Sequence, residues 1–557
     1  MPLAVLALGA LLVLVVGYVT YGRRIVRALG PDPNARTPAE RLRDDVDFTP
    51  TPLPYLIGQH FSAIAAAGPI AGPILACTQF GWLPCLVWIL LGVVFIGAVH
   101  DFTALFASVR HDARSVAEIA RQYLGPRAGV LLLVFIWLAL VYVVMAFTDI
   151  TAGTFVGAAE ELAGITQFDP GGAVALSSTL YLALAVTMGL LQRRFAPRLW
   201  LLTIVFVPAT LVSVWAGTQA STWLVASSRT WQIVILGYCV VASLLPVWSL
   251  LQPRGYLGGF VLYLALAVGT LGVVFGGYVV EQPAFTATPW FGLDGAPLFP
   301  FLFVTIACGA CSGFHGLVCS GTTSKQVANE AHCRPVGYGA MLAEAFVAVL
   351  ALCTALVASD PKAPPGVIYA DGLGRFLTQW LGPEHAAFAR TFGAMAFSTF
   401  VFDTLDVAVR LGRYILCELF GWKGRVGTVV ATLLTVGAPA ALLLGSKPNS
   451  YREFWALFGT SNQLLAALTL LCLTVWLKAS GRTTRFTLTP LVFVLAVTFT
   501  ALIMQTVGNT RAALSGATVD GIKAANAAAA FGLLALGAWL VVEAVLALRR
   551  THSASRA

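Results

Sequence analysis

The stretch GQHFSAIAAAGPIAGPIL, residues 58–75, decides how this chain folds. It is apolar enough for a membrane, yet it carries a histidine and two Gly-Pro steps, Gly68-Pro69 and Gly72-Pro73. A proline inside a helix removes an amide donor and leaves a carbonyl without its partner. Hydrocarbon tolerates such groups only where they are buried in protein or line a cavity. The stretch therefore predicts a helix broken within a membrane, either beside a bound substrate or at a close contact between helices.

The composition around this stretch is that of a membrane protein. Of the 557 residues, 58% are hydrophobic and 11% are charged, and the mean hydropathy is +0.83. Apolar runs of about 20 residues, the length that crosses a bilayer, recur along the whole chain. We therefore predict an all-α integral membrane protein with about 15 transmembrane helices. The candidate spans lie near residues 3–20, 54–77, 82–106, 128–157, 173–191, 199–217, 231–250, 258–280, 299–320, 337–358, 388–412, 427–445, 455–478, 487–507 and 524–548.

The distribution of basic residues predicts the orientation of these spans, because short loops rich in Lys and Arg stay in the cytoplasm. If the loop at 21–53 is inside, alternating spans place 26 of the 34 Lys and Arg residues on the cytoplasmic side and 8 outside. The N-terminus is then outside and the C-terminus is cytoplasmic. Residues 3–20 lack a basic segment before them, so we expect a retained helix and not a signal peptide. The net charge of +9 follows from this topology, and we expect no nucleic-acid partner.

A second interrupted span strengthens the substrate interpretation of the first. Residues 308–324, CGACSGFHGLVCSGTTS, again combine glycines, hydroxyls and a mid-membrane histidine, His315. The two stretches belong to the second and the ninth predicted spans, which are seven positions apart, so they cross the membrane in opposite directions. Paired discontinuous segments in opposed halves are typical of an inverted-repeat transporter whose site lies between them at the midplane. The candidate substrate-binding residues are His60, Ser62, Gly68, Gly72, Ser312, His315, Thr322, Asn462 and Gln463.

Five carboxylates lie within or near the predicted spans and are candidates for proton coupling, because ionisable groups are costly at membrane depth. Each carboxylate could instead have a purely structural role. Asp406 and Arg410 are spaced to form an ion pair along one helix, whereas Asp403 has no obvious partner in the sequence. Asp101 alternatively reaches the cytoplasmic interface, and Asp149 lies on a threonine-rich helix face that either lines a path or bonds a neighbouring helix. The candidates are Asp101, Asp149, Glu344, Asp403 and Asp406.

The motif FGTSNQLLAA, which begins at Phe458, places hydroxyls and amides together at Thr460–Gln463. These groups suit substrate or cation coordination, and they suit hydrogen bonds between helices equally well. Cys308, Cys311, His315 and Cys319 share a helical face, but a straight helix spreads them over about 16 Å. Zinc ligands must converge to about 2.0–2.3 Å from one ion, so we predict no metal site.

Several function classes are excluded by what the sequence lacks. The chain has no GxxxxGK[ST] loop and no soluble domain large enough to hold a nucleotide, so we predict neither an enzyme nor an ATP-driven pump. We expect no cofactor. The domain organisation predicted is an N-terminal helix with a cytoplasmic basic loop at 1–53, a transporter core at 54–480 and peripheral helices at 481–557.

Five motifs in order carry a resemblance to a known family. They are GQHFSAIAAAGPIAGPILA, LGVVFIGAVHDF, CSGFHGLVCSGTTSKQV followed by RPVGYGAMLAEAFVAVLAL, TLDVAVRLGRYIL and FGTSNQLLAAL. Over about residues 50–480 the chain resembles the carbon starvation protein A family. The resemblance implies a bacterial inner-membrane transporter related to the amino-acid/polyamine/organocation superfamily, induced when carbon runs short. Peptide uptake and proton-coupled pyruvate uptake are the activities it implies. Where family members often carry Gln, this chain has His100.

We therefore expect a secondary active transporter of small organic nutrients, pyruvate or short peptides, working by proton symport in the lipid bilayer. The alternatives are a sodium-coupled transporter of amino acids and a membrane nutrient sensor that does not transport. A monocarboxylate favours a positive helix N-terminus at the break. A peptide also needs a negative partner for its amine, such as Asp149 or Glu344, and the sequence leaves the choice of substrate open.

Overall fold

The computed structural model describes residues 1–44, 48–447, 450–515 and 519–554. Apart from one short antiparallel hairpin, β1 (Glu160–Leu162) and β2 (Ile165–Phe168), the regular structure of these residues is helical. The helices are α1 (Leu3–Gly17), α2 (Arg23–Leu29), α3 (Pro38–Arg41), α4 (Leu53–Ile64), α5 (Gly68–Phe80), α6 (Trp82–Gly92), α7 (Ala98–Arg110), α8 (Val116–Leu124), α9 (Pro126–Thr154), α10 (Pro170–Phe195), α11 (Leu199–Gln219), α12 (Ser228–Leu244), α13 (Leu251–Phe275), α14 (Leu298–Thr305), α15 (Gly313–Gly321), α16 (Ala340–Leu356), α17 (Pro365–Leu381), α18 (Ala386–Phe420), α19 (Gly424–Gly445), α20 (Tyr451–Ala479), α21 (Arg485–Leu514) and α22 (Gly521–Ala554).

Twelve helices in the described residues are long and apolar enough to cross a membrane, or 13 if the bent pair α4–α5 counts as one span. The twelve correspond to twelve of the predicted spans. The other three predicted spans are interrupted or short. Residues 54–77 form the bent pair, 231–250 overlap the shorter apolar helix α12, and 299–320 divide into α14 and α15. The chain is thus an all-helical, multi-pass membrane protein, and the predicted count of about 15 transmembrane helices is not confirmed.

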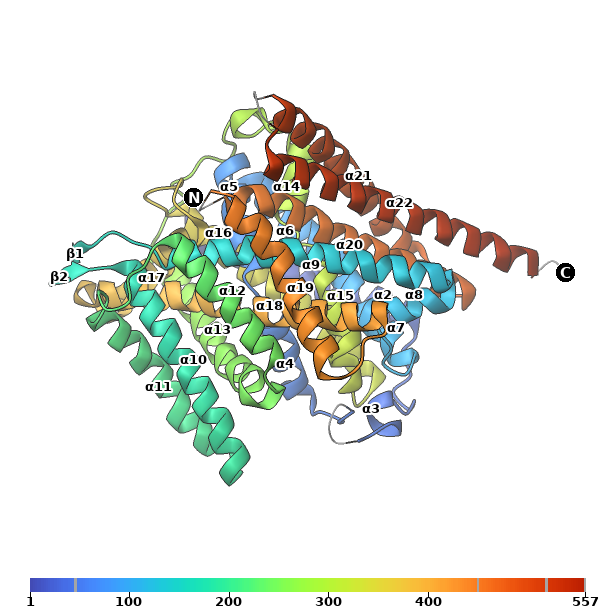
Figure 1. Ribbon diagram of the computed structural model, residues 1–557, viewed down its shortest axis with the longest axis horizontal. Helices are drawn as coiled ribbons and strands as arrows, with labels where there is room; N and C mark the ends of the chain where they lie inside the picture. Colours follow the sequence, from blue (N-terminus) through green and yellow to red (C-terminus); the bar gives the residue numbers. More distant parts are fainter. Residues whose placement is uncertain (45–47, 448–449, 516–518, 555–557) are drawn as a thin grey trace.

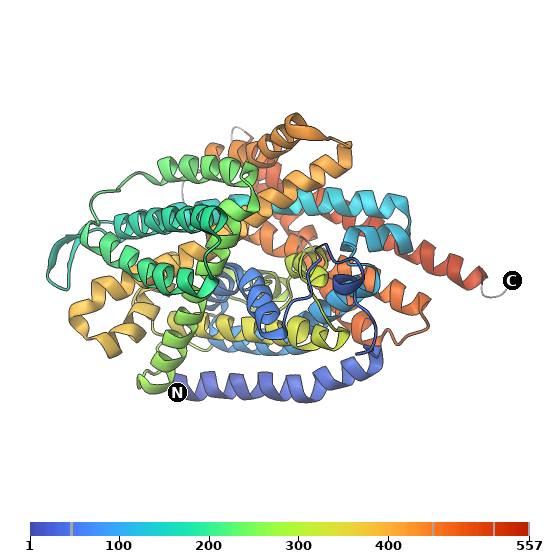
Figure 2. The same ribbon diagram turned by 90° about the horizontal axis from the view of Figure 1, so that it is seen from below.

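The helices are arranged around a buried centre (Figures 1 and 2). In α20, 94% of the most apolar window is buried, whereas in α11 and α22 only 28% is buried. Figure 1 shows α10 and α11 projecting on one side of the molecule and α22 on the other, and Figure 2 shows α1 running along one edge. The apolar faces of these outer helices are exposed in the isolated chain, which is the surface expected to contact lipid. Polar side chains of α20 and its neighbours are therefore shielded from lipid.

Helix α17 lies in a stretch that the sequence leaves without a predicted helix. It packs on α18 and α13. Arg390 at the start of α18 forms ion pairs with Asp371 of α17 and with Glu160 of β1. The hairpin and α17 are thereby joined to the same end of α18.

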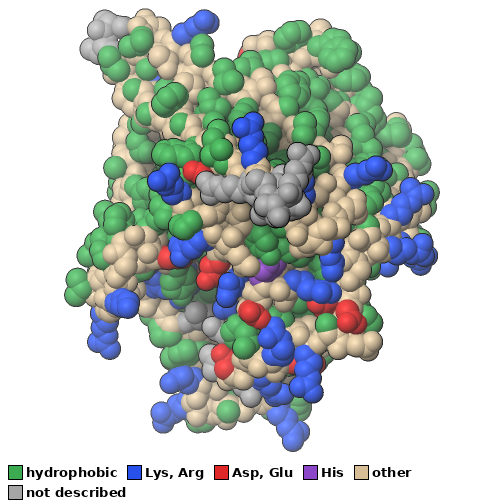
Figure 3. Space-filling model, turned by 90° about the vertical axis from the view of Figure 1, so that its right-hand side faces the viewer, with side chains coloured by type: hydrophobic (Ala, Val, Ile, Leu, Met, Phe, Trp, Pro, Cys, Tyr) green, Lys and Arg blue, Asp and Glu red, His purple; other side chains and the backbone are tan. Residues whose placement is uncertain are grey.

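The segment before α4 is tied to the segment after α15. Backbone amides of Thr49 and Thr51 donate to the carbonyls of Lys325 and Gln326, at 3.3 and 3.0 Å. Nearby, Glu330 pairs with Arg110 of α7 at 2.6 Å and is almost fully buried. Basic side chains are spread over the lower part of the face shown in Figure 3. The end of the predicted basic loop is thus bonded directly to the segment that follows α15.

Candidate functional site

The first break separates α4 from α5, whose axes are bent by 45°. Helix α4 ends at Ile64 and α5 begins at Gly68, so the interruption lies at Ala65–Ala67. The prediction that the Gly-Pro steps themselves interrupt the helix was wrong by about one turn. Pro69 lies in the first turn of α5 and Pro73 lies inside that helix. A proline is compatible with the first turn because the amide it lacks has no partner there.

The second break separates α14 from α15 and is longer. Helix α14 ends at Thr305 and α15 begins at Gly313. The carbonyls left at the end of α14 are bonded by side chains of α20. Trp455 Nε1 donates to Thr305 O at 3.2 Å, and Gln463 Nε2 donates to Phe303 O at 3.2 Å. A helix end buried at this depth needs such partners.

Asn462 of α20 bonds the beginning of α15. Its Oδ1 accepts a hydrogen bond from the amide of Phe314 at 2.9 Å. Its Nδ2 lies 3.1 Å from Ser312 Oγ and 3.2 Å from Cys308 Sγ. The polar motif of α20 therefore holds the ends of the broken helix, which is the interhelical alternative that the sequence left open. Three candidate substrate-binding residues, Ser312, Asn462 and Gln463, make these contacts.

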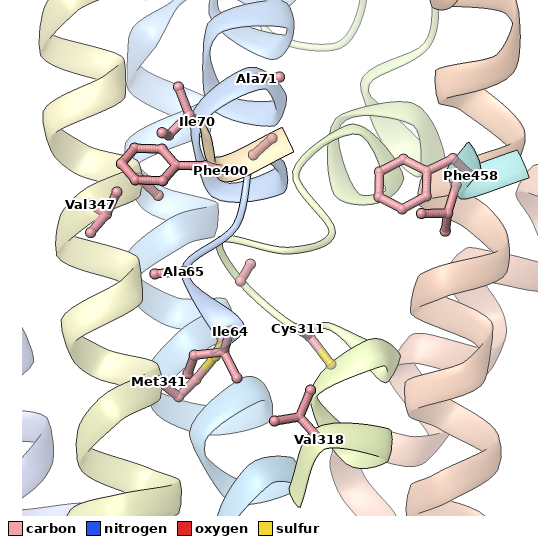
Figure 4. Packing of buried hydrophobic residues seen from close by; sticks show 14 of the residues in the cluster. Ile64, Ala65, Ile70, Ala71, Cys311, Val318, Met341, Val347, Phe400 and Phe458 are labelled. Carbon is pink, nitrogen blue, oxygen red and sulfur yellow. The ribbon is translucent and has the colours of Figure 1, made fainter. Parts of the chain in front are cut away.

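The two breaks lie against each other. A Cβ placed on Gly68 would lie 2.6 Å from Cys308 Cβ, and one placed on Gly72 would lie 2.8 Å from Thr305 O. No side chain fits at either position without a shift of its neighbours. Figure 4 shows the two unwound links, at Ala65 and before Cys311, among buried apolar side chains. Gly68 and Gly72 thus permit close contact between the interrupted segments.

A chain of ionisable side chains adjoins the second break. His315 Nδ1 of α15 lies 2.8 Å from Asp101 Oδ2 of α7, and His100 Nδ1 lies 2.7 Å from Asp101 Oδ1. On its other side, His315 Nε2 lies 3.4 Å from Glu344 Oε2 of α16. All four side chains are at most 1% exposed. The alternative that Asp101 reaches the cytoplasmic interface is therefore wrong.

His60 lies on α4 beside this chain and is also buried, at 1% exposure. Its Nδ1 is 2.8 Å from Thr323 Oγ1, and its Nε2 has no hydrogen-bond partner in the described part of the chain. The predicted Thr322 is exposed, follows the last residue of α15 and donates to the carbonyl of Val318 in that helix. Ser62 is partly buried and lies on the α13 side of α4. Thr323, and not the predicted Thr322, is therefore the threonine that contacts His60.

Asp403 and Asp406 of α18 share a partner that the sequence analysis missed, Arg254 of α13. Arg254 Nη1 lies 2.5 Å from Asp406 Oδ2, and its Nε donates to Asp403 Oδ1 at 2.9 Å. The guanidinium is fully buried. Arg410 instead donates to the carbonyls of Ala242 and Leu245 at 2.9 Å. The prediction that Asp403 lacks a partner was wrong, and Arg410 binds the end of α12 through these carbonyls.

Asp149 of α9 is bonded to α12. Gln232 Nε2 donates to Asp149 Oδ1 at 2.6 Å, and both side chains are fully buried. This is the bond to a neighbouring helix that the sequence offered as one alternative for Asp149. Of the five predicted carboxylates, Asp101 and Glu344 contact His315 of the second broken segment.

The chemistry open to the Glu344–His315–Asp101 chain is reversible proton binding. Two buried carboxylates with one imidazolium between them leave one negative charge without compensation, which is costly in a low-dielectric interior. One further proton removes that charge. Across the described residues, no group of three or more His, Cys, Asp or Glu side chains is arranged to hold a metal ion.

Comparison with known proteins shows which sequences this chain resembles. A family model described as "Carbon starvation protein CstA" matches residues 3–363 and 361–501. A relative named peptide transporter CstA from Mycobacterium tuberculosis H37Rv is 32% identical over 570 residues, covering 87% of this chain and 73% of the relative. The protein of that name from Escherichia coli K12 is 33% identical over 576 residues, covering 87% and 78%.

Two further similarities concern proteins named as transporters of other substrates. The pyruvate/proton symporter BtsT of Escherichia coli K12 is 31% identical over 576 residues, covering 85% of this chain and 77% of the relative. Among solved structures, a manganese transporter of Eremococcus coleocola bound to an aromatic bis-isothiourea compound is 14% identical, covers 92% of this chain and 99% of that chain, and has a TM-score of 0.49.

Proposed function

This chain belongs to the carbon starvation protein CstA family, and from that premise we propose that it is a secondary active transporter that takes up pyruvate or short peptides by proton symport. Its relatives are named as a peptide transporter and as a pyruvate/proton symporter. We place the protein in the bacterial inner membrane, with uptake serving the cell when carbon is short. It is not an enzyme in this proposal.

The observation that carries proton coupling is the buried chain of Glu344, His315 and Asp101 beside the second break. A histidine between two carboxylates can pass a proton from one to the other while the net charge of the group stays small. His315 belongs to α15 itself, so its contacts change if the broken helix moves. Binding of a proton to these three side chains is thereby linked to the conformation of α15.

Sodium coupling is less well supported by the same contacts. The amide side chains of Asn462 and Gln463, which the sequence offered as cation ligands, already bond the ends of α15 and α14. A sodium ion at Asn462 Oδ1 would have to displace the bond from the Phe314 amide and leave that backbone group unsatisfied. Gln463 Oε1, which has no partner among the described residues, remains open to a cation. We retain a proton as the coupled ion because the buried contacts of His315 with Asp101 and Glu344 supply groups that can bind one.

We further propose that α4–α5 and α14–α15 are equivalent segments of an inverted repeat, within a transporter core at residues 54–480. Both are interrupted, and the two interruptions are in contact at Gly68 and Cys308. Substrate is then held between them, with His60, Ser62, Ser312 and His315 among its contacts. Midplane binding between two broken segments is the arrangement such transporters use.

Glu344 is the better partner for the amine of a peptide. Asp149 is already bonded by Gln232. Neither oxygen of Glu344 has a hydrogen-bond partner among the described residues, although Oε2 lies 3.4 Å from His315. A carboxylate whose oxygens have no hydrogen-bond partner can bind an ammonium group. A peptide with a free amine therefore suits this site.

Uptake by purified protein in liposomes tests the proposal. Labelled pyruvate and a labelled dipeptide are offered separately under an inward proton gradient, an inward sodium gradient or neither, with protein-free liposomes as the control. We expect accumulation of at least one substrate above its external concentration only with the proton gradient. Accumulation that follows sodium and ignores the proton gradient contradicts proton symport. Failure to accumulate either substrate under any gradient contradicts the proposed function.

A further inference from the structure

His100 lies at the end of the row of buried ionisable side chains formed by Glu344, His315 and Asp101. One of its two ring nitrogens has no hydrogen-bond partner among the described residues. Its Nδ1 is engaged with Asp101. Its Nε2 is fully buried and has no hydrogen-bond partner within the residues that the structure describes. Buried polar atoms in folded proteins are nearly always hydrogen-bonded, and where no protein group serves, ordered water does.

Thr469 of α20 presents a second such atom. Thr460 and Thr474 of the same helix donate to the carbonyls of Ala456 and Leu470, four residues earlier, at 2.7 Å each. The hydroxyl of Thr469, which is 1% exposed, makes no bond of this kind or any other to the described residues. It therefore points away from the carbonyls of its own helix.

Gly316 of α15 lies next to both of these atoms. A Cβ placed on Gly316 would lie 3.3 Å from His100 Nε2 and 3.4 Å from Thr469 Oγ1. Both unpartnered atoms therefore face the place where any other residue would begin its side chain. The helices that carry them, α7, α15 and α20, pack on one another.

We propose that a water molecule is bound between His100 Nε2 and Thr469 Oγ1, beside Gly316, at the two buried atoms that have no partner among the described residues. Water can donate to the ring nitrogen while it accepts from the threonine hydroxyl, so both buried atoms are satisfied. The bound water extends the chain of proton-exchanging groups from Glu344 through His315, Asp101 and His100 to α20. This role in proton movement rests on the proposed symport, whereas the binding of the water does not.

The binding itself is tested by structure. The full chain in lipid nanodiscs is imaged at a resolution that shows buried water, as wild type and as Gly316→Ala. We expect density within hydrogen-bond distance of His100 Nε2 and Thr469 Oγ1 in the wild type, and none in the variant, whose methyl group occupies that space. A map that shows other buried waters and none here overturns the proposal.

The role in coupling is tested by transport. Gly316→Ala and Thr469→Val are expected to lose accumulation driven by a proton gradient while exchange of labelled for unlabelled substrate continues. Thr469→Ser keeps the hydroxyl and is expected to accumulate. Gly508→Ala is the matched control, because nothing lies within 4 Å of a Cβ placed there.

The outcomes separate the two claims. Normal proton-driven accumulation by both Gly316→Ala and Thr469→Val overturns the role of the water in coupling. A wild type that exchanges substrate but never accumulates it under a proton gradient overturns symport and this role together. The density comparison decides the binding of the water in either case.

Discussion

Arg254 is the residue whose loss should cost the most stability. It is the shared partner of Asp403 and Asp406 in the buried contact between α13 and α18. Removing one member of a buried ion pair leaves a buried charge without compensation and costs about 3–5 kcal/mol. We expect Arg254→Met to lower the thermal unfolding temperature of the detergent-solubilised protein strongly.

The control and the rescue for this variant are both available in the chain. Arg425→Met replaces an exposed arginine and should leave the unfolding temperature unchanged. Combining Arg254→Met with Asp403→Asn and Asp406→Asn removes the uncompensated charges and should restore much of the loss. A single Arg254→Met variant as stable as the wild type contradicts this account of the cluster.

Asn462 should matter for the shape of the site and not for the coupled ion. It accepts from the amide of Phe314 at the start of α15, and loss of such a capping bond costs about 0.5–2 kcal/mol. Asn462→Ala should therefore lower the unfolding temperature modestly and weaken substrate binding, measured as a higher concentration for half-maximal exchange. Asn509→Ala on α21 is the control. If Asn462→Ala keeps full affinity but switches the driving ion, the capping role is refuted.

At the scale of single residues, the sequence predicted which side chains are unusual more successfully than it predicted their partners. Asp101, His315 and Glu344 were candidates because ionisable groups are rare at membrane depth, and the structure brings all three together. Arg254 was missed because it precedes the predicted span 258–280, where a basic residue is ordinary, whereas α13 begins at Leu251. No spacing rule connects it with Asp403, since the pairing depends on how α13 packs on α18.

Contact between the two interrupted elements depends on glycine at position 68. In Gly68→Ala the added methyl would collide with Cys308, whose Cβ would lie 2.6 Å away. We expect lower stability and loss of substrate exchange, because backbone at the second break cannot move without breaking its bonds to α20. Gly437→Ala on α19 is the matched control, since nothing lies within 4 Å of a Cβ there.

Cys308→Gly provides the rescue, because it removes the atoms that the new methyl meets. The double variant should recover exchange that Gly68→Ala loses. If Gly68→Ala alone exchanges substrate normally, the close contact of the two breaks is not required for transport.

At the scale of elements, the local pattern predicted that two spans are interrupted, but it misplaced the first interruption. A Gly-Pro step is equally compatible with a break and with the first turn of a new helix, and here α5 begins at Gly68. The span 231–250 was predicted to continue beyond Leu244, where α12 ends, because apolar composition does not show where a helix ends. Helix α17 was missed since its mixture of apolar and charged residues fails a hydropathy criterion.

For the whole molecule, the orientation predicted from the basic residues awaits a direct measurement. We expect the N-terminus outside and the C-terminus in the cytoplasm. A reporter that is active only in the cytoplasm should be active when fused after Ala557 and inactive when fused before Met1. The opposite pair of results would invert the topology and place the tie between Thr51 and Gln326 on the outer face.

The class of the molecule followed from its composition and periodicity, whereas its mechanism depends on contacts between residues far apart in the chain. Asp101 and His315 are separated by 214 positions, and Asn462 and Phe314 by 148. Such pairs are fixed by packing of whole helices, which a single sequence does not specify. That is why the candidates for the site could be named in advance and their arrangement could not.

The most direct test of the central claim is to replace Asp101 with Asn and measure accumulation and exchange in the same liposomes. Asparagine keeps the size of the side chain but cannot hold or release the proton that links His100 and His315. The account predicts that Asp101→Asn exchanges labelled for unlabelled substrate across the membrane and no longer accumulates it under a proton gradient. Accumulation by Asp101→Asn equal to that of the wild type, under the same proton gradient, would contradict the account.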